Sequence, residues 1–173
     1  MTVVACAPPS ESLLGRTAIK TAYFADAYTT TLSGAGLAIV EIYAGLFGHA
    51  PLYVKLILVS RNMMARAAGL ETPTVAEIMR VEIAGAYQVG DKIGPWPVFA
   101  INRDEIFAGR DNRHLDFRLS VFRQVDGGVA RVTVSTLCHV HNLAGRVYLF
   151  FVKPFHRFGV KALMRQAAAA GRI

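Results

Sequence analysis

The amino-acid sequence predicts a single α+β domain, residues 1–173, in which an antiparallel sheet packs against a closing C-terminal helix. Two segments of apolar–polar alternation, residues 113–125 and 128–141, flank an Asp-Gly pair and predict a β-hairpin. Apolar residues at helical spacing follow the first predicted strand. The 173 residues are 53% hydrophobic and 18% charged, so the chain is long and apolar enough to bury a core.

The N-terminal half predicts one strand followed by two short helices. Residues 1–15 predict a loose N-terminus, whereas residues 17–31 are rich in Thr and Tyr and favour an extended strand. Apolar spacing predicts a first helix within residues 37–47 and a second over residues 52–68. Residues 78–87 predict either a strand or an irregular segment.

The C-terminal half predicts strands joined by short turns and then a helix. A strand is expected over residues 98–107, and residues 109–112 predict a turn before the hairpin. Beyond the hairpin, residues 142–145 predict a turn and residues 146–152 another strand. A final helix is expected over residues 154–170, because its opening proline is tolerated in the first helical turn.

The hairpin turn also predicts a register. If Asp126 and Gly127 form the two-residue loop, Leu119 pairs with Val134 across the two strands. The apolar partners then lie on one face and polar side chains on the other, as a half-buried antiparallel sheet requires.

The formal net charge of +7 raises the question of a nucleic-acid partner. The arginines are scattered between Arg61 and Arg131, however, although residues 153–172 are basic without any acid, so we expect no nucleic-acid binding. Weak attraction to an anionic membrane or an acidic ligand fits this charge at least as well. The most apolar stretch, residues 36–59, is interrupted by charged residues and by Pro51, which favours two packed helices over stable membrane insertion.

The two cysteines, Cys6 and Cys138, lie too far apart in the sequence to indicate a disulfide framework or a metal motif. A reducing, cytoplasmic location fits this cysteine content best. Residues 1–10 lack the basic region and apolar run of a signal peptide. No Gly-rich phosphate loop occurs, and we expect neither a cofactor nor a bound metal.

Four short motifs in order resemble a known family. They are VSRNMMARAAGL at residues 59–70, DNRHLDF at 111–117, HNLAGRVYL at 141–149 and KPFH at 153–156. Together they are similar to the family catalogued as domain of unknown function 2867, over about residues 27–166. No activity is established for that family, so the resemblance implies a fold more than a function.

That family is in turn similar to the helix-grip superfamily, which includes START domains, polyketide cyclases and pollen-allergen-like proteins. The resemblance implies a curved antiparallel sheet that grips a long C-terminal helix, two short helices after the first strand, and a ligand cavity between sheet and helix. The final helix predicted for this chain, residues 154–170, is shorter than in lipid-transfer members, so we expect a small or partly filled cavity.

The apolar face of the predicted sheet would line such a cavity. Trp96, the only tryptophan, stands between two prolines and has two interpretations, as an aromatic at the pocket mouth or as a loop anchor. The other lining side chains expected are Leu115, Phe117, Leu119, Val134, Thr136, Val140 and Leu149.

Polar side chains on the opposite face predict a row with two interpretations. A histidine beside a carboxylate can act as a base, and paired histidines can bind metal. The alternative, which we favour, is a hydrogen-bonded ladder on the outer face of the sheet. The row consists of His114, Asp116, His139 and His141, with Tyr148 expected beside His139.

Glu105, Tyr148 and His156 are the candidates for acid–base chemistry. Glu105 would serve as an acid in the cavity or, as we favour, as the ion-pair partner of Arg113 or Arg118. His156 would bind the acid group of a ligand or, more simply, join the final helix to the sheet.

Three functions follow as hypotheses. The first is binding of a small hydrophobic molecule or lipid between the sheet and the C-terminal helix, driven mainly by apolar burial. The second is a cyclase- or isomerase-like enzyme that moves a proton with a cavity carboxylate or histidine. The third is a protein-interaction module or the subunit of a homo-oligomer.

Overall fold

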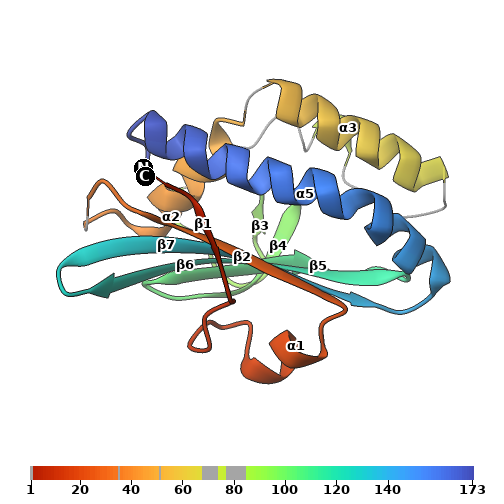
Figure 1. Ribbon diagram of the computed structural model, residues 1–173, viewed down its shortest axis with the longest axis horizontal. Helices are drawn as coiled ribbons and strands as arrows, with labels where there is room; N and C mark the ends of the chain where they lie inside the picture. The colour runs from red at the N-terminus through yellow and green to blue at the C-terminus, as the bar shows by residue number, and fades with distance from the viewer. Residues whose placement is uncertain (1, 35, 51, 68–73, 77–84) are drawn as a thin grey trace.

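The computed structural model describes residues 2–34, 36–50, 52–67, 74–76 and 85–173. Its central feature is a curved antiparallel sheet with the strand order β1-β2-β7-β6-β5-β4-β3 (Figure 1). The strands are β1 Val4–Cys6, β2 Phe24–Thr31, β3 Lys92–Ile93, β4 Trp96–Ile101, β5 Glu105–Arg110, β6 Leu115–Asp126 and β7 Val129–Val140.

Helices lie on both faces of this sheet. Figure 1 shows α5 running across one face, which we call the inner face, with α2 and α3 on the same side, while α1 lies on the opposite, outer face. The helices are α1 Arg16–Thr21, α2 Ile39–Tyr43, the π-helical turn η1 Ala44–Gly48, α3 Leu52–Ala67 and α5 Leu143–Ala169. The predicted α+β architecture, a curved antiparallel sheet packed on a C-terminal helix, is therefore confirmed.

The β6–β7 hairpin confirms the predicted division of faces but not the predicted register. Its loop is Gly127–Gly128, whose φ angles are 55° and 82°, and Asp126 pairs with Val129. A type I′ turn needs positive φ at both central residues, which glycine adopts without strain. Leu119 therefore pairs with Thr136, two residues further along β7 than predicted, and each side chain keeps its predicted face.

The turn predicted at residues 142–145 and the strand predicted at residues 146–152 are wrong, because α5 begins at Leu143 and includes the rest of both segments. Asn142 caps this helix: its side-chain oxygen accepts a hydrogen bond from the Gly145 N–H at 3.2 Å. Pro154 lies inside the helix and removes one N–H donor without ending it. The helix has 27 residues, so the expectation of a short final helix is also wrong.

The strand predicted over residues 98–107 is in fact a hairpin of two strands, β4 and β5. Asn102 forms the turn, since its side-chain oxygen accepts hydrogen bonds from the N–H groups of Asp104 and Glu105 at 2.8 and 2.7 Å. Strand β5 then extends through Arg110, into residues that were predicted to turn.

The N-terminal segment has more structure than predicted. Residues 1–15 were expected to be loose, but β1 pairs with β2, and the side chains of Ser12 and Leu14 are buried. The strand expected over residues 17–31 begins only at Phe24, because α1 occupies its first part.

The middle of the chain contains helices α2 and α3 and the described residues 85–87. The two helices expected after the first strand correspond to α2 with η1 and to α3. Within the segment 78–87, residues 78–84 lie outside the described residues, and residues 85–87 form no strand.

No single helix in the described part of the chain is long and apolar enough to cross a membrane. The segments Ile39–Gly48 and Leu52–Ser60 meet that criterion only as a pair, bent by 80°.

Two groups of buried apolar side chains pack between the inner face and the helices. The larger joins α2, η1 and the end of α5 to the centre of the sheet, and includes Ile42 and Met164. Phe117 packs against both groups and marks the boundary between them. The smaller group lies at the start of α5 and consists of Phe24, Leu115, Cys138 and Leu149.

Candidate functional site

The strand side chains that were predicted to line a cavity lie on the inner face. Leu149 comes from α5 instead of a strand, but it is buried against the same face. Of the seven predicted side chains on strands, four are buried and three are half-buried. The buried ones are Leu115, Leu119, Val134 and Thr136, and the half-buried ones are Trp96, Phe117 and Val140.

Four aromatic side chains form a row from α2 to the centre of the sheet. The ring centres of Tyr43 and Phe47 lie 4.7 Å apart, those of Phe47 and Trp96 6.4 Å apart, and those of Trp96 and Phe117 5.6 Å apart. Tyr43 is buried, whereas Phe47, Trp96 and Phe117 are half-buried. Trp96 is therefore part of an inner-face aromatic row and more than the anchor of a loop.

A polar group lies beside this row, where α5 crosses β2 and β7. Asp26 on β2 pairs in register with Thr136 on β7. Thr136 pairs in turn with Leu119 on β6, the next residue after Phe117 on the inner face. His156 on α5 places Nε2 3.4 Å from Asp26 Oδ1. The Tyr28 hydroxyl donates to Asp26 Oδ2 at 3.3 Å. We call Asp26, Tyr28, Trp96, Phe117, Thr136 and His156 the inner site.

Burial controls the electrostatics of the inner-face tyrosines. Desolvation raises the pKa of the Tyr28 hydroxyl, and the charge and hydrogen bond of Asp26 raise it further, against an opposing effect of Arg157. Burial raises the pKa of Tyr43 far above its usual value. The Tyr43 hydroxyl and His156 Nε2 are both buried without a hydrogen-bond partner among the residues that the structure describes. The His156–Asp26 contact is thus within ion-pair distance but lacks hydrogen-bond geometry.

Glu105 does not reach the inner face, so the idea of a cavity acid at this position is wrong. Its side chain is 1% exposed and lies on the outer face under the N-terminal segment. One carboxylate oxygen accepts hydrogen bonds from the hydroxyls of Ser12 and Ser120 at 2.5 and 2.6 Å, and the other accepts from Leu13 N at 2.8 Å. The ion pair expected with an arginine is replaced by these three hydrogen bonds.

The predicted polar row lies on the outer face and near the strand ends, where two of its members contact each other and the other two have partners outside the row. Asp116 Oδ1 contacts His141 Nε2 at 3.0 Å. His139 Nε2 lies 3.2 Å from the Ala18 carbonyl of α1. His114 Nδ1 lies 3.1 Å from the side-chain oxygen of Asn142, the cap of α5, so this histidine helps to fix the helix start. In the part of the chain that the structure describes, no group of three or more His, Cys, Asp or Glu side chains is arranged to hold a metal ion.

Tyr148 is a residue of α5 and packs, half-buried, against the smaller apolar group, so the expected strand contact with His139 does not form. Of the three acid–base candidates, His156 belongs to the inner site. It also contacts Phe24 edge-on, with ring centres 5.8 Å apart.

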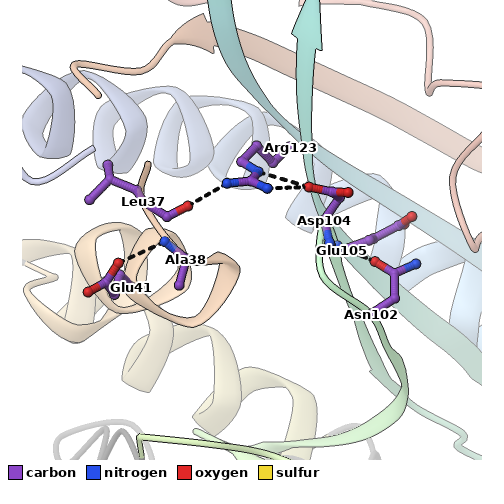
Figure 2. A network of polar contacts seen from close by, with 7 residues as sticks. All are labelled: Leu37, Ala38, Glu41, Asn102, Asp104, Glu105 and Arg123. Atoms are coloured by element: carbon purple, nitrogen blue, oxygen red, sulfur yellow. Dashed lines mark hydrogen bonds and ion pairs between the residues drawn. The ribbon is translucent and has the colours of Figure 1, made fainter. Parts of the chain in front are cut away.

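Arg123 fixes the start of α2 above the inner face. Figure 2 shows its guanidinium between two anchors, with Nη1 donating to the Leu37 carbonyl at 2.8 Å and Nε donating to Asp104 at 3.0 Å. Glu41 accepts from the Ala38 N–H at 2.7 Å and so caps the first turn of α2 (Figure 2). These contacts tie β6 and the β4–β5 turn to the helix that supplies Tyr43.

The residues that β2 contributes to the inner site were not predicted from the sequence. Phe24, Asp26 and Tyr28 occupy alternate positions of β2 and lie on its core-facing side. An aspartate between two aromatic residues at this spacing is the sequence feature that could have indicated a polar group in the core. The aromatic residues of α2 and η1, Tyr43 and Phe47, were predicted to be helical but were not assigned to a site.

The fold and the inner site define a sheet-and-helix α+β protein with aromatic and polar side chains gathered under its C-terminal helix. The chain belongs to the family described as protein of unknown function (DUF2867), whose family model matches residues 18–163. This confirms the family that the four short motifs indicated. No curated protein and no solved structure matches the chain.

Proposed function

We propose that the chain binds a small, mostly apolar molecule at the inner site, between the sheet and α5. The observation that carries this proposal is the row of half-buried aromatics Phe47, Trp96 and Phe117 on a face otherwise covered by helices. Protein interiors are packed to crystal-like density, so such side chains are normally covered by protein. A molecule that covers them gains about 25 cal/mol for each Å² of apolar surface removed from water.

The polar group beside the row would orient this molecule. His156 Nε2 is buried and has no hydrogen-bond partner among the described residues, so a ligand hydroxyl or carbonyl oxygen would satisfy it. Ligand sites typically combine an apolar lining with a few placed polar groups. The resemblance to START domains and polyketide cyclases supports the same function, because that resemblance implies a ligand between sheet and helix.

Energy transfer from Trp96 to the dye 8-anilinonaphthalene-1-sulfonate tests the proposal, because Trp96 is the only tryptophan and belongs to the site. Phe117→Ala is expected to weaken dye binding by about tenfold or more, since it removes a ring that the ligand would cover. Phe122→Ala is the matched control: Phe122 is also half-buried and on β6, but on the outer face. Equal losses in the two variants, or no transfer in the native protein, would contradict the proposal.

A second candidate function, acid–base catalysis of the cyclase or isomerase kind, is favoured by the contact between His156 and Asp26. In this case the histidine would move a proton on a ligand held against the aromatic row. Once a native ligand is identified, His156→Gln should abolish its conversion while leaving its binding within about threefold. Unchanged conversion in that variant would exclude His156 as the acid–base group.

A further inference from the structure

The outward side of the first half of α5 carries a large apolar surface. Its residues recur at spacings of three and four, so they share one face of the helix. Soluble monomers rarely expose a contiguous apolar patch of this kind, and such patches mark contact sites for a partner or a membrane. We call it the α5 outer face, and its side chains, each more than half exposed, are Leu143, Val147, Phe150, Phe151, Phe155 and Phe158.

A row of cations runs along the edge of this face that borders β2. Lys153 Nζ lies 4.9 Å from the ring centre of Tyr23, and Lys161 Nζ lies 5.6 Å from that of Tyr28. In both contacts the charged nitrogen of the lysine lies over an aromatic ring, so these cations follow the side of α5 that faces β2. The four cations of the row are Arg146, Lys153, Arg157 and Lys161.

The charge of residues 127–173 favours an anionic surface over a second copy of the chain as the partner of the α5 outer face. Residues 127–173 contain seven Lys and Arg and no Asp or Glu. A two-fold dimer formed by the α5 outer face would bring two sets of cations together without a carboxylate from this segment to pair with them. An anionic surface, by contrast, is complementary to the whole edge of the helix.

We propose that the α5 outer face binds the surface of an anionic lipid bilayer. Phenylalanine and leucine on one side of a helix with Lys and Arg beside them is the pattern of helices that lie in the membrane interface. The apolar side chains enter the boundary between headgroups and acyl chains, and the cations contact lipid phosphates. This surface points away from the inner site, so the inference goes beyond the proposed ligand binding and does not depend on it.

Co-sedimentation of the full chain with phosphatidylcholine vesicles, with and without 30 mol% phosphatidylglycerol (about 0.1 M salt), tests this directly. We expect binding to the anionic vesicles that weakens as salt is added, and about tenfold or more weaker binding to the neutral ones. The double variant Phe150→Ser/Phe158→Ser should lose about tenfold or more, and Lys153→Gln/Arg157→Gln about thirtyfold. These side chains are partly or largely exposed, and circular dichroism checks that each variant is folded.

Matched controls come from the tip of the β6–β7 hairpin, at the opposite end of these strands from the start of α5. Val125→Ser/Val129→Ser removes exposed apolar side chains, and Arg131→Gln removes one exposed charge. Each control should change vesicle binding by less than about twofold. Equal losses in the controls, or no binding to anionic vesicles, would overturn the proposal. Self-association that depends on Phe150 and Phe158, without vesicle binding, would also overturn it and would assign the face to a second copy of the chain.

Discussion

Replacing Glu105 with glutamine changes one oxygen of a buried side chain into an NH₂ group and leaves its shape unchanged. In the native protein the carboxylate accepts three hydrogen bonds, two from the hydroxyls of Ser12 and Ser120 and one from Leu13 N. The glutamine oxygen can keep the bond from Leu13 N. Its NH₂ group then faces the two hydroxyls, which must turn to accept and lose their charged acceptor.

The cost follows from these contacts. A hydrogen bond to a charged group contributes about 1.5–3 kcal/mol, against about 1 kcal/mol for a neutral one. Glu105→Gln loses the difference between a charged and a neutral hydrogen bond at two or three bonds, and rotation of the hydroxyls offsets part of this loss. We therefore expect the substitution to lower the free energy of unfolding by about 2 kcal/mol. The Ser12→Ala change removes one of the same bonds, so the two substitutions should be less than additive.

Urea unfolding followed by circular dichroism measures these values. Glu11→Gln is the matched control, because Glu11 is exposed and next to Ser12, and it should stay within about 0.5 kcal/mol of the native protein. Hydrogen exchange of the amide of Leu13 should accelerate in Glu105→Gln and not in the control. If both variants were equally stable, the anchoring role assigned to Glu105 would be refuted.

Three other outcomes are expected. A Cβ at Gly145 would clash with the His114 carbonyl oxygen, whereas one at Gly159 on the same helix would meet open space. Gly145→Ala should therefore cost about 2 kcal/mol or more in urea unfolding, and Gly159→Ala should be neutral or stabilising by up to about 1 kcal/mol; similar effects of the two would be inconsistent with the placement of α5. Arg123→Met removes the guanidinium contacts drawn in Figure 2 and should lower the free energy of unfolding by about 2–3 kcal/mol. An unchanged free energy of unfolding would mean that water replaces these contacts in the variant. Because burial raises the pKa of Tyr43, its neutral form stabilises the fold below the unfolded pKa of about 10, and this contribution is lost as the pH rises above that value. Tyr43→Phe should have a free energy of unfolding within about 1 kcal/mol of the native protein at pH 7. Between pH 7 and pH 10.5 the variant should lose less stability than the native protein. An equal loss in the two proteins would argue against a contribution of neutral Tyr43 to the pH dependence.

The hairpin illustrates what the sequence could predict. Alternation in β6 and β7 placed Phe117 and Thr136 on the apolar side, and a register error of two residues left them there, because side chains alternate with a period of two. The choice of loop residues depended on backbone angles, since two consecutive positive φ values favour Gly127–Gly128 over a loop that contains aspartate.

The start of α5 could not be predicted in the same way. Residues 146–152 are rich in β-branched and aromatic residues, which favour strands, and Pro154 suggested a helix start. Packing against the inner face and the Asn142 cap outweighed both signals. The inner site depends on that helix, because Asp26 and His156 meet only when α5 crosses β2.

Native mass spectrometry of the purified chain, recorded before and after denaturation, tests the central claim most directly. We expect a small apolar molecule bound at one copy per chain, released only on denaturation, and absent or strongly depleted in Phe117→Ala but retained in Phe122→Ala. A native protein of bare polypeptide mass that also takes up neither lipids nor aromatic compounds would contradict ligand binding at the inner site.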